Sequence, residues 1–413
     1  MGRKSNDTEA VARLLRESPD IRSSAIVNLS RDLSRQELIE VYGEIQQKKE
    51  LVSDGARYPE FTRTFSEVLE EAEWVESLLS GQGIVYPIVL EMHLGTFCNS
   101  DCAFCFSKDV EYEKGERLEC QEAKNFLEHC KENGVREIWF SGGKEPLTSP
   151  VASDVILLAN GLGYKTRLYT NGILMTGSVC EKLIDCSQVR VSVSSASQDT
   201  YQKVHGRRGA KLRTIMSNIE RLVKLKNMNG SDVNVGVCCI IYGANYHEIR
   251  EMVNVWRLVG VDTIQLRKES VGKTEPLNEY QKCVILDQMA DICPGPDLDI
   301  RGLSEGELYG KTQFLPGMKR AELCRAGAWK RGIDPFGGVW NCDFAMHPGN
   351  RFSRGHLRLG GIRESSMEDI LASAEYPPHC EICQAHAYGL NIQLEKLRDD
   401  RDFGISLEEQ PWK

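Results

Sequence analysis

Hydrophobic and polar positions follow two different patterns along the chain. Within residues 1–85, apolar residues recur at the three- and four-residue spacing of amphipathic helices, most clearly over 38–45 and 61–79. A Ser-x-x-Glu capping box at 34–37 directly precedes the first of these runs. This spacing predicts that residues 1–85 form a helical extension.

From residue 86 onward, short apolar strands alternate with amphipathic helices. The predicted strands are 88–94, 137–141, 165–170, 189–193, 233–241 and 263–267. The predicted helices are 120–133, 152–160, 178–183, 212–226, 246–258 and 279–290. Such a βα series is typical of an α/β fold with a parallel sheet and outer helices, which right-handed crossovers curl into an open or closed barrel. Functional loops then lie at the carboxyl ends of the strands.

The last third of the chain is richer in glycine and turns. Residues 329–333 and 339–342 flank an Asp-Pro-Phe-Gly-Gly turn and predict a hairpin. Helical spacing returns at 366–374 and around 391–400. We therefore expect three parts: a helical extension over 1–85, a barrel over 86–295 and a smaller cysteine-bearing module over 296–413.

Composition limits the possible functions. The net charge of -9 argues against a broad nucleic-acid surface, and no apolar run is long enough to cross a bilayer. The N-terminus shows no apolar segment of the kind that secretory signals carry, so we expect a cytoplasmic protein without a membrane or nucleic-acid partner. Fifteen cysteines in a reducing compartment favour metal or redox chemistry over disulfides.

Three cysteines directly follow the first predicted strand: Cys98, Cys102 and Cys105. A 4Fe–4S cluster needs four ligands, so three local thiolates leave one iron open to a substrate or cofactor. A zinc site is the alternative, because thiolates also bind zinc. The C-x3-C-x2-C spacing, with Phe104 before the last cysteine, resembles the signature of the radical S-adenosylmethionine (SAM) superfamily.

Further motifs strengthen this resemblance. The second predicted strand ends in Gly-Gly-Lys-Glu-Pro, which is similar to the family's Gly-Gly-Glu-Pro motif with Lys144 inserted. Aligned on the proline, Glu145 would bind the SAM amino group; aligned on the glycines, Lys144 occupies the glutamate position. The resemblance assigns six residues to SAM binding: Phe104, Gly142, Gly143, Glu145, Ser192 and Ser194.

A second cysteine set lies in the C-terminal part: Cys324, Cys342, Cys380 and Cys383. Its order, with a hairpin between the first two and a final C-x2-C pair, resembles the twitch or SPASM modules that hold an auxiliary 4Fe–4S cluster. No cysteine follows Cys383, so the single-cluster twitch type is the better match. Structural zinc is the alternative for four cysteines of this kind.

The resemblance covers about residues 86–270 and implies a partial (β/α)6 TIM-like barrel. It also implies the chemistry: an electron from a donor such as flavodoxin or ferredoxin reduces the cluster, SAM is cleaved to a 5′-deoxyadenosyl radical, and this radical takes a hydrogen atom from the substrate. The chain is thus expected to be an oxidoreductase, isomerase or lyase of natural-product biosynthesis.

The substrate remains open between two classes. A small polar molecule, such as an amino sugar, aminocyclitol or nucleotide sugar, would be dehydrogenated, epimerised or cleaved by elimination. A ribosomally made peptide would be epimerised, cross-linked or excised, but residues 1–85 do not have the pattern of a peptide-recognition domain. A zinc-stabilised scaffold without enzyme activity is a third hypothesis. Cys238 or Cys239 points into the barrel, either as a hydrogen-atom donor or as core packing.

Overall fold

A computed structural model of the chain describes residues 83–375 together with Trp74, Ser77 and Leu78, apart from gaps at 109–110, 113–114, 207–210, 270–271, 294–297, 304, 310–323, 343 and 347–356. The predicted helices over 38–45 and 391–400, most of the one over 61–79, and both Cys380 and Cys383 therefore lie outside the described residues. The chain divides into two compact units, and the one formed by Tyr86–Leu315 and Ala326–Pro377 contains the sheet described below.

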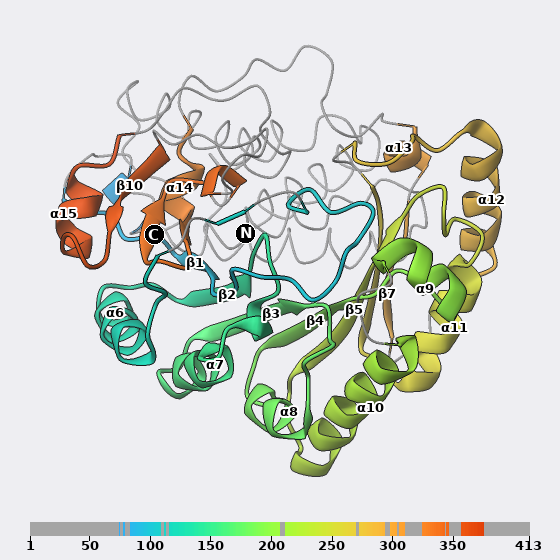
Figure 1. Cartoon of the computed structure of the whole chain (residues 1–413), viewed down its shortest axis with the longest axis horizontal. Helices are drawn as coiled ribbons and strands as arrows, with labels where there is room; N and C mark the ends of the chain where they lie inside the picture. Colours follow the sequence, from blue (N-terminus) through green and yellow to red (C-terminus); the bar gives the residue numbers. More distant parts are fainter. Residues whose placement is uncertain are drawn as a thin grey trace, which may run out of the picture. The chain divides into compact units, whose positions relative to one another are not determined.

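One sheet of ten strands organises this unit (Figure 1). Its strands are β1 (Val89–His93), β2 (Glu137–Ser141), β3 (Lys165–Thr170), β4 (Gln188–Ser192), β5 (Asn234–Ile241), β6 (Thr263–Lys268), β7 (Asp299–Arg301), β8 (Lys330–Ile333), β9 (Gly338–Trp340) and β10 (Arg358–Gly361). The order is β10-β9-β8-β1-β2-β3-β4-β5-β6-β7. From β8 through β7 in this order, neighbouring strands are parallel, whereas β9 pairs antiparallel with both β8 and β10. The six predicted parallel strands are confirmed to within about a residue or two, and so is the hairpin.

The helices that follow the strands cover one face of the sheet (Figure 1). They are α6 (Cys120–Glu132), α7 (Ala152–Gly161), α8 (Gly177–Leu183), α10 (Leu212–Asn229) and α11 (Ile249–Val259), and α12 (Glu279–Ala290) packs on α11. Shorter elements are η2 (Pro146–Thr148), α9 (Gln198–His205), α13 (Glu305–Leu308), α14 (Ala326–Trp329), η3 (Phe344–Met346) and α15 (Met367–Ala372). All six predicted helices of the βα series are present, and α9 and the edge strand β7 were not predicted.

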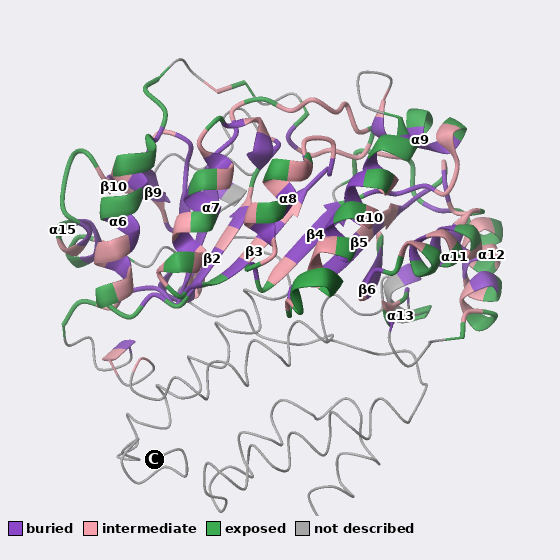
Figure 2. Cartoon of the chain, turned by 90° about the horizontal axis from the view of Figure 1, so that it is seen from below, coloured by how far each residue is buried: buried purple, intermediate pink, exposed green. Residues whose placement is uncertain are grey.

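The two faces of the sheet differ in chemistry. Residues that face the helices are buried and mostly apolar. Figure 2 shows the buried positions along the strands behind the helices. Examples are Leu90, Ile138, Leu168, Val191 and Val237. Because side chains alternate along a strand, the intervening residues face the opposite side, and there they are mostly polar or charged. This face is called the polar sheet face below.

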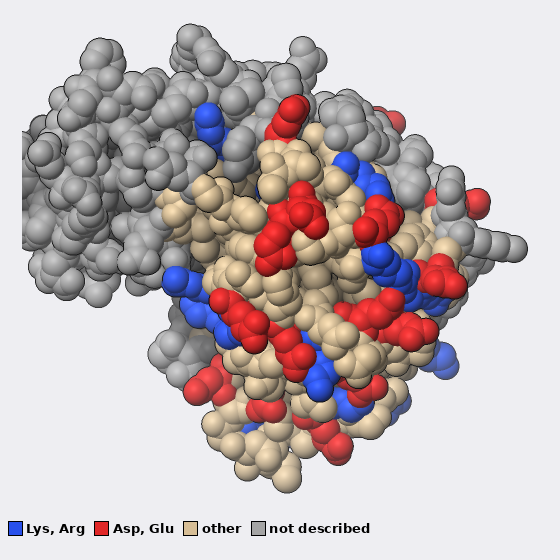
Figure 3. Space-filling model, turned by 90° about the vertical axis from the view of Figure 1, so that its left-hand side faces the viewer, with Lys and Arg blue, Asp and Glu red and all other residues tan. Residues whose placement is uncertain are grey.

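The surface carries both signs of charge. On the face seen in Figure 3, acidic and basic side chains are intermingled. Arg363 and Glu122 form one of the ion pairs of the described residues. Among the described residues, none of the helices combines the length and the apolar character that a membrane span requires.

Candidate active site

The three cysteines of the first set lie on the loop that leaves the carboxyl end of β1. Cys98, Cys102 and Cys105 are all half-buried. Residues of this loop contact two other segments: the loop after β2 and the C-terminal end of α9. The cysteines are therefore held by tertiary contacts rather than by regular secondary structure of their own.

Helix α9 supports the cysteine loop through backbone hydrogen bonds. The amide of Asp101 donates to the carbonyl of His205 at 3.0 Å, and the amide of Ala103 donates to that of Val204 at 2.9 Å. Gly206 ends the helix with a φ of +80°, and a Cβ there would lie 2.8 Å from the Asp101 carbonyl oxygen. Only glycine combines this φ with such a close approach, so Gly206 lets the loop pack against the end of α9.

The three thiols do not converge on a single point in this structure. Within the described part of the chain, no three His, Cys, Asp or Glu side chains surround one metal-ion position. The thiolates of a 4Fe–4S cluster each bond a different iron, so the three cysteines do not need to meet at one point. Burial raises the pKa of Cys98, and it raises the pKa of Cys102 to about 12. A bound iron would deprotonate these thiols outright.

The loop after β2 packs directly on the cysteine loop. Gly142 has a φ of +146°, and a Cβ at this position would lie 3.1 Å from the His93 ring. The Ser107 hydroxyl donates to the carbonyl of Gly143 at 2.6 Å. The inserted Lys144 donates through Nζ to the carbonyl of Ser107 at 3.0 Å. The insertion thus joins the Gly-Gly-Lys-Glu-Pro loop to the segment just after Cys105.

Glu145 is buried, and its carboxylate has an internal set of donors. It accepts hydrogen bonds from the Thr170 hydroxyl at 2.6 Å, from the Asn171 amide at 2.7 Å and from the Leu147 amide at 3.2 Å. Burial raises the pKa of Glu145, and these hydrogen bonds oppose that rise. The Asn171 side chain extends from the same place toward Cys98, with Nδ2 and Sγ 4.0 Å apart. Glu145 therefore ties the ends of β2 and β3 together beside the cysteine loop.

The variant Glu145→Gln tests how much of this role is structural. The glutamine amide can take either of two orientations. In one its NH2 group faces the Asn171 N–H, and in the other it replaces the oxygen that accepts from the Thr170 hydroxyl. Because a hydrogen bond is lost either way, we expect a loss of about 1–3 kcal/mol in the free energy of unfolding. Thr170→Val, which removes one donor, is the matched control. If Glu145 also binds the SAM ammonium, the Kd for SAM rises more in Glu145→Gln than in Thr170→Val; equal values would leave Glu145 only a structural role.

The remaining residues assigned to SAM lie in different surroundings. Ser192 is exposed at the carboxyl end of β4, on the polar sheet face. Ser194 is completely buried, and its hydroxyl accepts the Ile240 amide at 2.9 Å. Phe104 is half-buried, with its ring edge-on to those of His205 and Tyr242. Ser192 is thus the more accessible of the two serines.

The polar sheet face carries charged side chains that the sequence analysis did not single out. Lys330 on β8 and the Ser141 hydroxyl both hydrogen-bond the Glu91 carboxylate. Burial alone would raise the pKa of Glu91, but Lys330 and His93 hold it well below its usual range. The alternation of charged residues within otherwise apolar predicted strands is the signal that would have identified this face.

Arginines continue the polar sheet face across β3 and β4. Arg167 pairs with Glu137 at 3.0 Å. Arg190 donates to the neutral Gln265 side chain at 2.7 Å and lies over the Tyr169 ring, 5.5 Å from its centroid. Its Nε has no hydrogen-bond partner among the described residues, although the side chain is buried. The middle of this face therefore holds a cation whose described hydrogen-bond partner is neutral.

Two cysteines of the second set are described. Cys342 follows β9, and Cys324 belongs to the other compact unit; both are half-buried. Cys380 and Cys383 lie outside the described residues, so the four-cysteine site stays a prediction.

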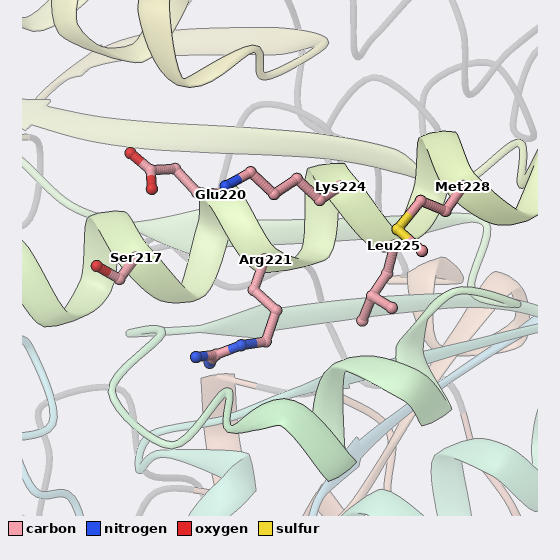
Figure 4. Close-up of a pocket in the computed structure, with 6 residues that line it drawn as sticks. All are labelled: Ser217, Glu220, Arg221, Lys224, Leu225 and Met228. Atoms are coloured by element: carbon pink, nitrogen blue, oxygen red, sulfur yellow. The ribbon is translucent and has the colours of Figure 1, made fainter.

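A shallow surface depression lies elsewhere, on α10 (Figure 4). Its lining residues all come from this one helix: Ser217, Glu220, Arg221, Lys224, Leu225 and Met228. The C-terminal half of α10 leads into the amino end of β5, whereas the cysteines follow the carboxyl end of β1. This depression is therefore not part of the candidate site.

Comparisons with known proteins agree with these motifs. Residues 92–255 match the family model described as the radical SAM superfamily. The tungsten-containing aldehyde ferredoxin oxidoreductase cofactor-modifying protein of Pyrococcus furiosus is 23% identical over 331 residues, which are 78% of this chain and 91% of that protein. The dTDP-4-amino-4,6-dideoxy-D-glucose ammonia-lyase of Streptomyces venezuelae is 22% identical over 55% of this chain and 47% of its own.

A further relative and a solved structure complete the comparison. The mycofactocin maturase MftC of Mycolicibacterium smegmatis is 24% identical over 68% of this chain and 70% of its own. The crystal structure of Streptococcus suis SuiB bound to S-adenosylmethionine superposes with a TM-score of 0.53 at 16% identity, over 81% of this chain and 77% of that one. This likeness confirms the partial-barrel fold with a C-terminal antiparallel module. The enzyme matches leave no support for the zinc-stabilised scaffold.

Proposed function

Because the chain belongs to the radical SAM superfamily, we propose that Cys98, Cys102 and Cys105 hold its SAM-cleaving 4Fe–4S cluster. The observation that carries this proposal is the gathering of three half-buried thiols on one supported loop at the end of β1. When bound, the cluster and SAM supply a 5′-deoxyadenosyl radical that takes a hydrogen atom from an unactivated C–H bond. The protein's part is to orient SAM and the substrate and to keep water away from the reacting atoms.

The residues around the cysteine loop have distinct parts in this proposal. Glu145, Gly142 and Gly143 form the loop that approaches SAM, and Lys144 ties that loop to the cysteine segment through the Ser107 carbonyl. Ser192, exposed at the end of β4, hydrogen-bonds the SAM ribose or carboxylate. Phe104 packs beside the cluster. Ser194, whose hydroxyl is occupied by the Ile240 amide, acts by keeping β4 and β5 in register.

We propose that the substrate is a small polar molecule, such as an amino sugar, aminocyclitol or nucleotide sugar. The polar sheet face supports this, because its hydroxyl, carboxylate and guanidinium groups recognise a polar molecule better than an apolar one. Arg190 in particular lacks a carboxylate partner among the described residues, which favours an anionic group such as a phosphate or carboxylate on the substrate. The sugar-modifying relative from Streptomyces venezuelae is consistent with this class.

Maturation of a ribosomally made peptide is the second candidate. The match to the mycofactocin maturase covers a larger share of both chains than the match to the Streptomyces venezuelae lyase does. This difference in coverage favours the peptide candidate. Deuterium transfer separates the two candidates. Reduced enzyme and SAM are incubated with deuterated nucleotide amino sugars and, in parallel, with deuterated precursor peptides. Deuterium in 5′-deoxyadenosine from a sugar supports the first candidate, and transfer from a peptide alone would replace it with the second.

Cys238 is the barrel cysteine that faces the polar side of the sheet. It pairs in register with Ser192 on β4 and Gln265 on β6, whereas Cys239 is buried among the helix-facing core and its thiol donates to the Val193 carbonyl at 3.1 Å. If Cys238 returns a hydrogen atom to the substrate radical, Cys238→Ala abolishes deuterium uptake from deuterated water into the product. Cys239→Ala is the matched control and retains uptake. Equal uptake in both variants would show that Cys238 is not the donor.

We further propose that residues 296–413 form a module in which Cys324, Cys342, Cys380 and Cys383 hold a second 4Fe–4S cluster. Its role would be to relay an electron from the substrate radical or to shape the substrate site. A flavodoxin or ferredoxin would supply the electron that starts the reaction. This division assigns residues 1–85 to a helical extension and 86–295 to the barrel.

A further inference from the structure

His205 is a buried histidine for which the sequence offers no role. It is the last residue of α9, and only 1% of its surface is exposed. Its ring lies between the end of β4 and the cysteine loop, in contact with residues from both. A buried imidazole of this kind must satisfy two ring nitrogens, and the partners it uses determine where its proton sits.

Hydrogen-bond partners determine the tautomer of His205. The backbone amide of Ser194 donates to Nε2 at 2.9 Å, so Nε2 is an acceptor and carries no proton. The proton of the neutral ring is therefore on Nδ1. Nδ1 lies 3.2 Å from Sγ of Cys102, which makes this N–H a donor to the thiol sulfur.

The His205 ring is held so that this donor cannot turn away. It stacks on Tyr201 with ring centroids 4.8 Å apart and an interplanar angle of 26°, and Phe104 meets it edge-on at 5.7 Å. The Ser100 hydroxyl donates to the His205 carbonyl at 3.0 Å and lies 3.4 Å from the Cys102 sulfur. Ring and thiol are thus fixed from both sides.

We propose that His205 is a positioning residue that donates an Nδ1–H hydrogen bond to the Cys102 thiolate and thereby raises the reduction potential of the SAM-cleaving cluster. The inference rests on the proposed assignment of Cys102 as a cluster ligand. A donor near a ligand sulfur stabilises the extra negative charge of the reduced cluster more than it stabilises the oxidised one. The other two sulfurs have different surroundings: Cys98 has a backbone hydrogen bond from Ser100 and lies 4.0 Å from Asn171 Nδ2, and Cys105 lies 3.5 Å from Ser107 Oγ. Among the described contacts of the three, Cys102 is the one with an imidazole N–H on its sulfur.

The test compares three variants of the whole protein, each loaded with iron under anaerobic conditions. His205→Phe keeps an aromatic ring between Tyr201 and Phe104 but removes the donor, and His205→Asn keeps an N–H at the δ position. His247→Phe is the control, because His247 is exposed. The measured quantities are the iron content and the midpoint potential of the cluster. Electron paramagnetic resonance in the absence of SAM monitors the reduced cluster during the redox titration.

We expect the ratio of reduced to oxidised cluster at a fixed potential to fall roughly tenfold in His205→Phe, which is 59 mV for a one-electron couple. His205→Asn should lie closer to the wild type, and His247→Phe should match it. Wild-type potential in an iron-loaded His205→Phe would overturn the inference. The variant His205→Phe could fold but take up no iron. In that case, iron uptake by His205→Asn supports the role of the N–H donor, and failure of His205→Asn to take up iron overturns the inference. Wild-type protein without iron would instead refute the proposed function.

Discussion

We expect the triple variant Cys98→Ala, Cys102→Ala, Cys105→Ala to form no 5′-deoxyadenosine from SAM, whereas the wild type forms it. No other substitution is expected to have a larger effect. All three ligands of the SAM-cleaving cluster are lost, so no open iron remains to bind SAM. Bound iron should fall from roughly eight to roughly four per chain if the second cysteine set holds its own 4Fe–4S cluster. Liquid chromatography of the reaction products and an iron assay measure both values.

Three exposed cysteines offer a matched control for this variant. Cys120, Cys283 and Cys293 lie on the surface, and we expect their joint replacement by alanine to leave both iron content and 5′-deoxyadenosine formation unchanged. Circular dichroism should give the same secondary structure for both triple variants and the wild type. Residual SAM cleavage in the first variant would mean that other residues hold the active cluster.

The second large effect is expected from Gly95→Ala. Gly95 is buried where the chain leaves β1, and a Cβ there would overlap the backbone carbonyl of Glu145 and lie 3.1 Å from Thr148 Oγ1. The carbonyl cannot turn aside as a side chain would, so the two loops must separate. Their joining hydrogen bonds, from the Glu145 amide and the Thr148 hydroxyl to the Phe97 carbonyl, would then weaken. We expect a loss of about 1–3 kcal/mol in unfolding free energy.

The separation of the loops should also reach SAM, because the Glu145 loop and the cysteine loop contact it together in this account. The Kd for SAM, measured by equilibrium dialysis on iron-loaded protein, should rise by about tenfold, which corresponds to 1.4 kcal/mol. Gly161→Ala is the control: Gly161 ends α7, and a Cβ there meets nothing within 4 Å. Unchanged stability and SAM affinity in Gly95→Ala would show that the two loops do not act as one site.

The βα series could be predicted closely from the sequence because apolar residues alternate with polar ones along short strands, and amphipathic helices separate these strands. Helix α9 was missed because only Tyr201 and Val204 mark its apolar side over eight residues. Strand β7 was missed because it is an edge strand of three residues. The hairpin β8–β9 was expected, but its parallel pairing with β1 depends on a contact between distant segments, which periodicity does not reveal.

The candidate site likewise contains residues that could be predicted from the sequence and residues that could not. The cysteines and the glycine motif were identified because their chemistry is encoded in local spacing. Asn171 and His205 were not identified, because the cysteines that they contact lie 73 and 103 positions away in the sequence. Glu145 was assigned to SAM from its motif, and only the structure reveals that Thr170, Asn171 and Leu147 already donate to its carboxylate. Local motifs thus identify the ligands, and tertiary contacts decide their surroundings.

The most direct test of the central claim is reductive cleavage of SAM by the wild-type chain. Protein purified without oxygen is incubated with dithionite and SAM, and the products and bound metals are measured. We expect brown protein with roughly eight irons per chain and formation of 5′-deoxyadenosine together with methionine. Colourless protein that binds zinc, or iron-loaded protein that leaves SAM intact under these conditions, would contradict the central claim.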